Sequence, residues 1–500
     1  MTMSVTMSKK TLFIKGIALF IFVLFIMMSA IPGTSGKLAV KVNRENITAQ
    51  NNSIQETFFE ISPSEQWNKT FGGNHSDRGF YCEQTSNEGY IITGHTWSYG
   101  NGGYDVWLIR TDADGNEEWN KTFGGENDDV GVSVHFTIDD GYIITGSTDS
   151  YGAGNSDVWL IKTDAFGNEE WNKTFGKEYN DWGWSVHQTI DNGYVITGII
   201  EPYEEDVRDL WLIKTDANGN EEWNKTFGGV ENDYGYSVQQ TSDGGYLILG
   251  ETNSYGSGSG DAWLIKTDIN GTEEWNKTFG GANHDAGISM QIEQDKGYII
   301  TGITRSFGLD DGDVWLIRTD VFGNEQWNRT FGGTSYDCGT SIDTTEDGGF
   351  IICAITETYG VGEEDVWLIK TDSSGNEQWN KTFGGTNEDW GYSVQQTTDG
   401  GYIIGGCTMS YGAGDVDVWL IKVAAKAELK LTFFFGYVTN IIHMEDFIKF
   451  NAQNLFYLVF QPLNFGGYKS SKEIIAKQVL ALTIEGNPGI VLGFYKTSLL

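Results

Sequence analysis

A repeat of 52 residues dominates the sequence and constrains the fold more than any other feature. The tryptophan of the motif WNKTFG, once WNRTFG, recurs with this spacing at Trp67, Trp119, Trp171, Trp223, Trp275, Trp327 and Trp379. The tryptophan of a second motif, WLI, keeps the same spacing at Trp107, Trp159, Trp211, Trp263, Trp315, Trp367 and Trp419. Such a period, free of insertions and deletions, indicates a repeat protein whose units pack against their neighbours.

Each unit predicts four strands. In the copy that begins at Gly235, the runs SVQQT, GYLILGET, DAWLIKTD and EEWNKTF are rich in β-formers and are separated by turn residues. The dipeptide Asn270-Gly271 suits the positive φ angles of a two-residue hairpin turn. No stretch of the unit has helical periodicity. Four antiparallel strands per repeat are typical of one blade of a β-propeller.

The ends of the repeat region predict how the ring closes. Glu65–Phe71 is a fourth strand with no strands before it, and the last copy stops at Val423, where its own fourth strand is missing. We therefore expect an all-β, seven-bladed propeller in which the N-terminal strand completes the last blade and leaves no free edge. The alternative is a linear solenoid, which would leave an unpaired strand at each end.

The segment TDADGNEEW (111–119) and its copies resemble the tryptophan-docking hairpin of quinoprotein propellers, in which an aspartate, a turn glycine and a tryptophan recur in each blade. The unit as a whole resembles the secreted β-propeller repeats common in archaeal and bacterial surface proteins. This resemblance spans about 360 of the 500 residues and implies the fold but no activity, since propellers carry unrelated functions. The adjacent cysteines of the pyrroloquinoline enzymes are absent, so that cofactor is not implied.

The segments before and after the repeats differ from the repeats in composition. Residues 1–31 place Lys9, Lys10 and Lys15 before an apolar run with a small-residue end, which predicts a secretory signal; an uncleaved anchor is the alternative. Residues 32–62 are polar and predict a linker, and residues 63–423 hold the propeller. Residues 424–500 lack tryptophan and the repeat, and their nature stays open.

The formal net charge of −37 argues against nucleic acid and anionic membranes as partners, because such a surface repels them. It suits high salt, divalent cations or basic partners. Four cysteines, Cys82, Cys338, Cys353 and Cys407, follow no repeating framework. Two disulfides and four free buried thiols are both compatible with the sequence.

Carboxylates recur at two positions of the unit, in loops that an up-and-down blade places on one face. The first ring precedes the first strand: Asp77, Asp129, Asp181, Asp233, Asp285, Asp337 and Asp389. The second precedes WLI: Asp105, Asp157, Asp209, Asp261, Asp313, Asp365 and Asp417. The first ring is a candidate site for Ca²⁺, and no other cofactor is expected. The alternative, favoured because all seven blades repeat it, is that each aspartate caps its own loop.

Aromatic residues of the same loops are candidates for a ligand-binding face. One recurs in every blade: Tyr99, Tyr151, Tyr203, Tyr255, Phe307, Tyr359 and Tyr411. The alternative is that each ring packs on its own glycine-rich turn. Residues that break the repeat are more informative, and they are Trp97, Trp182, Trp184, Trp390 and the acidic loop 201–206. These exceptions distinguish blades one, three and seven from the rest.

The WNKTF strand carries a glycosylation sequon in each copy. The asparagines are Asn68, Asn120, Asn172, Asn224, Asn276, Asn328 and Asn380. Strand alternation places them with the sequon threonines on one face, opposite the tryptophan and phenylalanine. We expect this face to be reachable on an outermost strand, so these residues are candidate N-glycosylation sites.

No catalytic motif accompanies the repeat. The sequence has no nucleophile elbow or P-loop, and its six histidines, His75, His95, His135, His187, His284 and His443, show no metal-ligand spacing. We expect a monomeric, secreted or cell-surface propeller, free or envelope-attached, that acts as a binding or scaffold module for an extracellular protein or polysaccharide. The alternatives are a carbohydrate-active enzyme with two carboxylates at the channel mouth, and a purely structural envelope protein.

Overall fold

The computed structural model describes residues 42–49, 52–61, 63–201, 207–293, 296–309, 311–425, 427–435, 477–483 and 491–497. It divides the chain into two units, residues 63–425 and residues 1–62 with 426–500. Every regular element of the described residues is a β-strand. Across these residues, no helix is long and apolar enough to cross a membrane. The predicted signal at 1–31 lies outside them.

Residues 63–425 form seven four-stranded antiparallel blades, as predicted. Blade one contains β4 (Asp77–Gln84), β5 (Tyr90–Thr96), β6 (Asp105–Thr111) and β7 (Glu117–Phe123). Blade two contains β8 (Asp129–Phe136), β9 (Tyr142–Thr148), β10 (Asp157–Thr163) and β11 (Glu169–Phe175). Blade three contains β12 (Trp182–Gln188), β13 (Tyr194–Ile200), β14 (Asp209–Thr215) and β15 (Glu221–Phe227). Blade four contains β16 (Asp233–Gln240), β17 (Tyr246–Thr252), β18 (Asp261–Thr267) and β19 (Glu273–Phe279).

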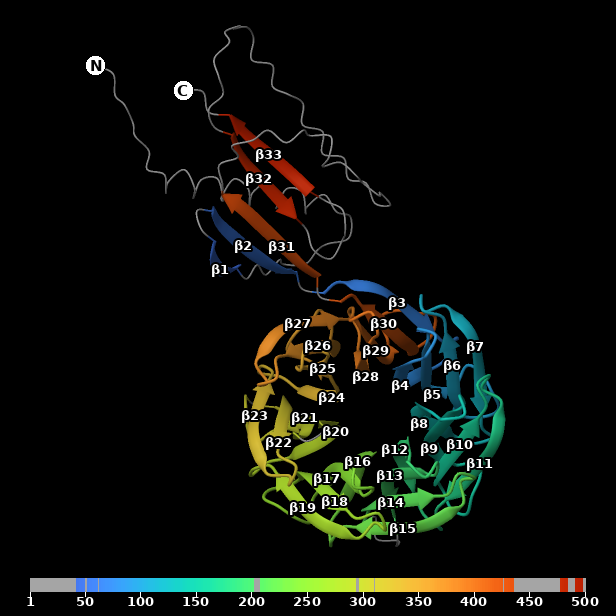
Figure 1. Ribbon diagram of the computed structural model, residues 1–500. Helices are drawn as coiled ribbons and strands as arrows, with labels where there is room; N and C mark the ends of the chain where they lie inside the picture. Colours follow the sequence, from blue (N-terminus) through green and yellow to red (C-terminus); the bar gives the residue numbers. More distant parts are fainter. Residues whose placement is uncertain are drawn as a thin grey trace, which may run out of the picture. The chain divides into compact units, whose positions relative to one another are not determined.

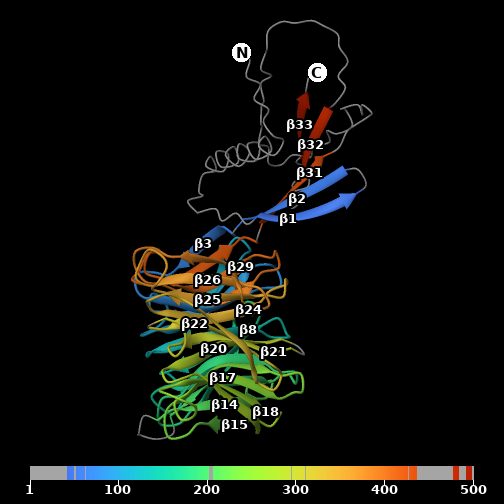
Figure 2. The same ribbon diagram turned by 90° about the vertical axis from the view of Figure 1, so that its left-hand side faces the viewer.

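The remaining blades repeat this order. Blade five contains β20 (Asp285–Glu293), β21 (Gly297–Thr304), β22 (Asp313–Thr319) and β23 (Glu325–Phe331). Blade six contains β24 (Asp337–Thr344), β25 (Phe350–Thr356), β26 (Asp365–Thr371) and β27 (Glu377–Phe383). Blade seven contains β28 (Asp389–Gln396), β29 (Tyr402–Thr408), β30 (Asp417–Val423) and β3 (Glu65–Phe71). The first strand of each blade lies nearest the propeller axis and the fourth lies at the circumference (Figure 1). Figure 2 shows the same disc from its edge.

The ring closes through β3, which completes blade seven. It pairs antiparallel with β30, and Phe71 lies opposite Val418 and Asn68 opposite Ile421. Strand β30 is therefore paired on both sides, and the solenoid alternative is wrong. This confirms the predicted closure.

The core lies between neighbouring blades. The YIIT and WLI strands are buried on both faces, and one cluster joins Ile91 and Leu108 of blade one to Val134 and Ile144 of blade two. The same packing crosses the closure, where Leu420 of blade seven meets residues of blade one. Each blade thus buries its faces against two neighbours, which explains strands that are apolar on both sides.

A tryptophan of each outer strand also contacts the next blade. The Trp67 ring lies against the turn glycine of blade one, so closely that a Cβ atom on Gly115 would lie 2.6 Å from Cζ3 of Trp67. Gly115 has a φ of 74°, and Nζ of Lys69 donates to Oδ1 of Asn116 at 3.1 Å. The WNKTF strand therefore holds adjacent blades together at the circumference.

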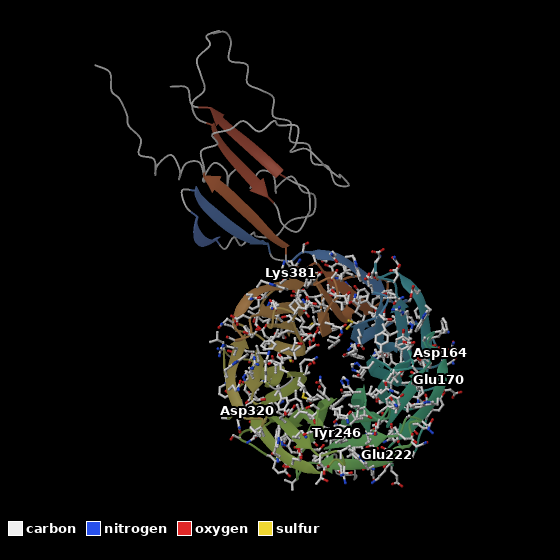
Figure 3. The ribbon with its side chains drawn as sticks, viewed as in Figure 1. Asp164, Glu170, Glu222, Tyr246, Asp320 and Lys381 are labelled. Atoms are coloured by element: carbon white, nitrogen blue, oxygen red, sulfur yellow. The ribbon has the colours of Figure 1, made fainter. Side chains whose placement is uncertain are left out.

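The hairpin between the third and fourth strands differs from the predicted two-residue turn. Only its glycine has positive φ, 73° at Gly271. The amide of Asp268 donates to the Thr272 carbonyl, and the Asp268 carboxylate accepts from the amides of Asn270 and Thr272. The aspartate stabilises this longer turn, which ends in a β-bulge. Asp164 and Asp320, which begin equivalent turns, lie at the circumference with Glu170 and Glu222, whereas Tyr246 lies further in (Figure 3).

The second unit contains two described sheets. Strands β1 (Val42–Ala49), β2 (Asn52–Ile61) and β31 (Ala427–Phe435) form one antiparallel sheet in the order β1-β2-β31. Strands β32 (Lys477–Thr483) and β33 (Val491–Thr497) form an antiparallel pair. Residues 32–62, for which the composition predicts a polar linker, thus contribute β1 and β2, and β2 includes the β-formers Phe58 and Phe59.

Candidate functional site

The first aspartate ring fixes loops within the protein. In every blade the buried carboxylate accepts the amide of the residue four positions earlier, as Asp77 does from Gly73 at 2.8 Å. Asp77 also accepts from the hydroxyls of Thr96 and Ser98 in the loop after β5. In blade two, Oδ2 of Asp129 accepts the amide of Gly125, but Oδ1 of Asp129 has no hydrogen-bond partner among the described residues. The ring thus caps the loops between blades and those after the second strand, and both lie on one face, which we call the loop face.

The second aspartate ring lies beside the first. A Cβ atom on Gly124 would lie 1.9 Å from Oδ1 of Asp105 and 2.8 Å from Oδ2 of Asp129, so the two carboxylates enclose this glycine. Burial and then the neighbouring Asp233 raise the pKa of Asp209 to about 6. Asp105 accepts the amide of Asn101 at 2.7 Å. Most of these carboxylate oxygens are engaged with their own loops, whereas Oδ1 of Asp129 and Oδ1 of Asp209 have no hydrogen-bond partner among the described residues.

The repeated loop aromatics are used within their blades. The Tyr151 hydroxyl donates to the Gly124 carbonyl at 3.0 Å, and its ring lies 5.4 Å from that of Trp159. The same ring contact recurs for Tyr99, Tyr255, Phe307, Tyr359 and Tyr411. Tyr203 lies outside the described residues. The described loop aromatics are still 42–48% exposed, so they stay ligand candidates together with the non-repeated aromatics.

A β-bulge in each first strand brings non-repeated side chains to the axis. In blade one the bulge lies between Gly79 and Tyr81 and leaves residue 80 unpaired. The equivalent residues are Phe80, Val132, Trp184, Tyr236, Ile288, Thr340 and Tyr392. Rings of neighbouring blades meet here, since Trp184 and Tyr236 have centroids 4.8 Å apart and Phe80 and Tyr392 5.3 Å. Neighbouring blades are closest to each other near the propeller axis and diverge away from it. Ring contacts between first strands of neighbouring blades therefore place these rings near the axis, at the inner rim.

Four aromatic rings of blades three and four, which we call the Trp184 cluster, lie together there: Trp182, Trp184, Tyr234 and Tyr236. Trp184 stacks on Tyr236 with an interplanar angle of 25°, and Tyr234 is nearly parallel to Tyr236 at 7°. Trp182 is 36% exposed, and the Arg208 guanidinium lies 5.7 Å from its ring centroid. The cluster presents flat apolar surface that the repeat does not require.

Polar groups continue this surface into blade five. The Tyr236 hydroxyl lies 3.4 Å from Oε2 of Glu251, whose Oε1 lies 2.9 Å from Nε2 of His284. This hydrogen bond raises the pKa of His284 against the effect of burial. In this region three buried polar atoms of the described residues have no hydrogen-bond partner: Oδ1 of Asn253, Nδ1 of His284 and Nε of Arg208, which lies 3.8 Å from Oε2 of Glu201. Such atoms are the donors and acceptors that a bound molecule or water would satisfy.

Blades seven and one carry a second group of rings, the Trp97 strip, which consists of Tyr392, Phe80, His95, Tyr104, Trp97 and His75. Beside it, the Arg78 guanidinium lies 5.2 Å from the Trp390 ring centroid, and Nε1 of Trp390 donates to Glu364. Burial and then Arg78 lower the pKa of His95 to about 4. Trp97 and Trp390, two of the predicted exceptions, therefore both lie in this region.

A further position near the axis was missed from the sequence. Glu83, His135 and His187 are equivalent residues of blades one to three; Oε2 of Glu83 lies 3.3 Å from Nδ1 of His135, and the imidazoles stack at 4.1 Å. The equivalents in blades four to seven bond instead to the backbone of the next blade, and they are Gln239, Gln291, Asp343 and Gln395. The spacing of 52 residues between the two histidines was the available signal.

The four cysteines are free and buried. Burial is the main cause that raises the pKa of Cys82, Cys353 and Cys407 to about 12 and that of Cys338 to about 11. Cys338 lies opposite Ile355 in its hairpin, so it does not face Cys353. The sequence was compatible with two disulfides or with four free thiols, and the structure has four free thiols.

Within the described ranges, no three histidine, cysteine, aspartate or glutamate side chains are grouped as metal ligands. His443 lies outside those ranges. The sequon asparagines lie on the outer strands, where Asn120 is exposed, accepts from Nε1 of Trp107 at 3.2 Å and donates to Glu117 at 2.6 Å. The same tryptophan contact recurs at Asn68, Asn172, Asn224, Asn276 and Asn380. At Asn328, which is half-buried, Nε1 of Trp315 has no partner among the described residues.

No protein-family model matches the sequence, and no curated protein matches it. Similar solved structures include the Pan2 WD40 domain of Neurospora crassa, with 10% identity and a TM-score of 0.45 over 75% of this chain and 97% of that one. Sqt1 of Chaetomium thermophilum has 10% identity and a TM-score of 0.41 over 72% and 98%. A protein of unknown function from Dyadobacter fermentans has 9% identity and a TM-score of 0.44 over 73% and 99%. Similarity this low says nothing about ligand or activity.

Proposed function

We propose that the protein is a glycan-binding module whose ligand lies on the Trp184 cluster at the inner rim of the loop face. One observation carries this proposal. Stacked, partly exposed aromatic rings lie beside buried polar atoms that have no hydrogen-bond partner among the described residues, in blades three to five. The propeller does not need these side chains, since blade two closes with Val130 and Val132 at the positions of Trp182 and Trp184.

The chemistry of a sugar fits both parts of this surface. A pyranose has apolar C–H faces that pack on flat aromatic rings, and hydroxyl edges that donate and accept hydrogen bonds. Arg208 and His284 supply nitrogen atoms, and Asn253 and Glu251 supply oxygen atoms, within one continuous group of residues. An apolar platform edged by a few oriented polar groups is the usual form of a small-molecule site.

Binding is better supported than hydrolysis. A glycosidase needs two carboxylates free to exchange protons with substrate and water. At the rim, Glu201 lies 3.8 Å from the Arg208 guanidinium, and Glu251 is engaged with His284. Both acids therefore hold neighbouring side chains in place.

The proposed function includes a location outside the cell. The signal predicted at residues 1–31 and the acidic surface favour a secreted or cell-surface protein, monomeric or attached to the envelope. An extracellular polysaccharide is then the available ligand. The repeats would belong with the secreted β-propeller repeats of archaeal and bacterial surface proteins. Their hairpin would correspond to the tryptophan-docking hairpin of quinoprotein propellers, which the contact of Trp67 with Gly115 supports.

A glycan array tests the proposal, followed by titration of the best-bound glycan. Trp184→Ala should weaken binding at least tenfold, because it removes the central ring of the cluster. Phe166→Ala is the matched control, since Phe166 is an exposed aromatic residue in a circumferential turn. Both variants must keep the wild-type melting temperature. Unchanged affinity of Trp184→Ala would contradict the proposed site.

A further inference from the structure

We infer that the Trp97 strip of blades seven and one is a second glycan subsite, so that the ligand is an extended chain rather than a single sugar. This inference rests on the proposed function and deepens it. It concerns residues separate from the Trp184 cluster and has its own test.

The strip forms a continuous path from the axis to the exposed surface. It begins at the inner rim with Tyr392 and Phe80, whose centroids are 5.3 Å apart, and Phe80 lies 5.4 Å from His95. His95 contacts Tyr104 at 4.4 Å, and Tyr104 contacts Trp97 at 5.6 Å. Trp97 is 52% exposed. Tyr392, Phe80, Tyr104 and Trp97 are each at least partly exposed, whereas His95 is buried between Phe80 and Tyr104. The exposed rings can hold successive sugars through their flat faces.

The strip is specific to this part of the ring. Its equivalents in blade two are Val132, Ser147, Ser156 and Asp149, and in blade six they are Thr340, Ile355, Glu364 and Glu357. The packing that is common to the blades therefore does not require the aromatic residues of blade one. Polar groups accompany the rings here as well, since Nδ1 of His95 is buried without a partner among the described residues.

The two groups of rings belong to one rim. Phe80 and Trp184 occupy the same position of their strands, two blades apart, and both contact an aromatic ring of a neighbouring blade. A chain seated on Trp184 and Tyr236 can therefore extend along the rim to Tyr392 and Phe80, and then outward to Trp97. The net charge of −37 favours a neutral chain over an anionic one.

Chain length provides the test. Oligosaccharides of two to eight sugars, from the best-bound neutral glycan of the array, are titrated into the full chain. Wild-type affinity should rise with length until both subsites are filled. Trp97→Ala should leave the affinity for the shortest binder unchanged and lower that for the longest about tenfold. Tyr104→Ala should act in the same way, and Phe166→Ala should have no effect at any length.

The outcomes separate the two proposals. If Trp97→Ala and Tyr104→Ala bind every length as the wild type does, the second subsite is wrong and the first is unaffected. If the wild type binds and Trp184→Ala binds every length equally well, the proposed function at the first site fails. If no glycan on the array binds, both are overturned. Melting temperatures equal to that of the wild type confirm that each variant is folded.

Discussion

His135 and His187 stack with their ring centroids 4.1 Å apart, although 52 residues separate them in the sequence. They hold the same position in β8 and β12. In blades four to seven, this position instead links two first strands; Oε1 of Gln395, for example, accepts the amide of Gln84 at 2.7 Å. Blades one to three replace that link with a chain of side chains that runs from Glu83 through both imidazoles.

This pair predicts loss of stability in acid. Burial and then the His135 ring lower the pKa of His187 well below 6.5, so the folded protein keeps this imidazole neutral where the unfolded chain protonates it. The stabilising contribution is therefore present above about pH 6.5 and is lost as the pH falls below it. His187→Gln should reduce the pH dependence of the unfolding free energy by up to about 1.4 kcal/mol per pH unit in that range.

Urea unfolding at pH 7.5 and pH 5.0 measures this difference. Glutamine is the residue that blades four, five and seven use at the same place, so the variant can form the missing link between strands. His75→Gln, at an exposed histidine, should keep the wild-type pH dependence. His95 is present in all three proteins, so its contribution to the pH dependence of the unfolding free energy does not affect the comparison between them. Equal pH dependence in wild type and His187→Gln would show that His187 is not the sensitive group.

The repeat predicted the fold, and the residues that break it, Trp97, Trp182, Trp184 and Trp390, were predicted as ligand candidates, but their contacts were not. The spacing of Trp67 and Trp107 and their copies predicted the repeat, and the β-former runs between turn residues predicted the four strands of each blade. The lone strand Glu65–Phe71 and the stop at Val423 predicted the closure. The Trp184 cluster depends on differences between copies and on a β-bulge that turns residue 184 and its equivalents toward the axis. Contacts such as Phe80 with Tyr392 join residues more than three hundred positions apart, and no local pattern encodes them.

Two glycines separate the cost of backbone strain from that of packing between blades. Gly271 and Gly348 have similar φ angles of 73° and 77°. A Cβ atom on Gly271 would lie 2.6 Å from Cζ3 of Trp223, whereas one on Gly348 meets nothing within 4 Å. Gly348→Ala should cost about 1 kcal/mol of stability, and Gly271→Ala should cost about 1–3 kcal/mol more. Urea unfolding measures both, and equal losses would mean that the Trp223 contact contributes nothing.

Closure by β3 predicts the effect of removing it. Deletion of residues 65–73 takes away the partner of β30, and the exposed edge should pair with a second molecule. Size-exclusion chromatography with light scattering should then detect dimers or larger species. Adding a peptide of residues 63–73 should restore the monomer. A truncated protein that stays monomeric with an unchanged melting temperature would contradict this account of closure.

The aspartate rings predict that calcium acts only as a salt. The Asp77 carboxylate already accepts from Gly73, Thr96 and Ser98. The unpartnered Oδ1 atoms of Asp129 and Asp209 belong to different blades, and among the described residues no three carboxylates are grouped around either as a ligand set for an ion. Added salt should raise the melting temperature, because it screens repulsion within a chain of net charge −37. Sodium and calcium chloride at equal ionic strength should have the same effect. An additional shift with millimolar calcium would indicate a bound ion.

The outer strands predict a graded pattern of glycosylation. Asn120 and five of its equivalents are exposed, whereas Asn328 is half-buried beside Arg329, whose guanidinium donates to the Asn328 carbonyl at 2.7 Å. Glycosylation requires Nδ2, which Asn120 donates to Glu117 on the solvent side of the strand, where a transferase can replace it. We expect sugars at some of the exposed asparagines and none at Asn328. Peptide mapping and intact-mass spectrometry of protein from its own host measure this. The mass of the bare mature chain would refute glycosylation, and a modified Asn328 would refute the role of exposure.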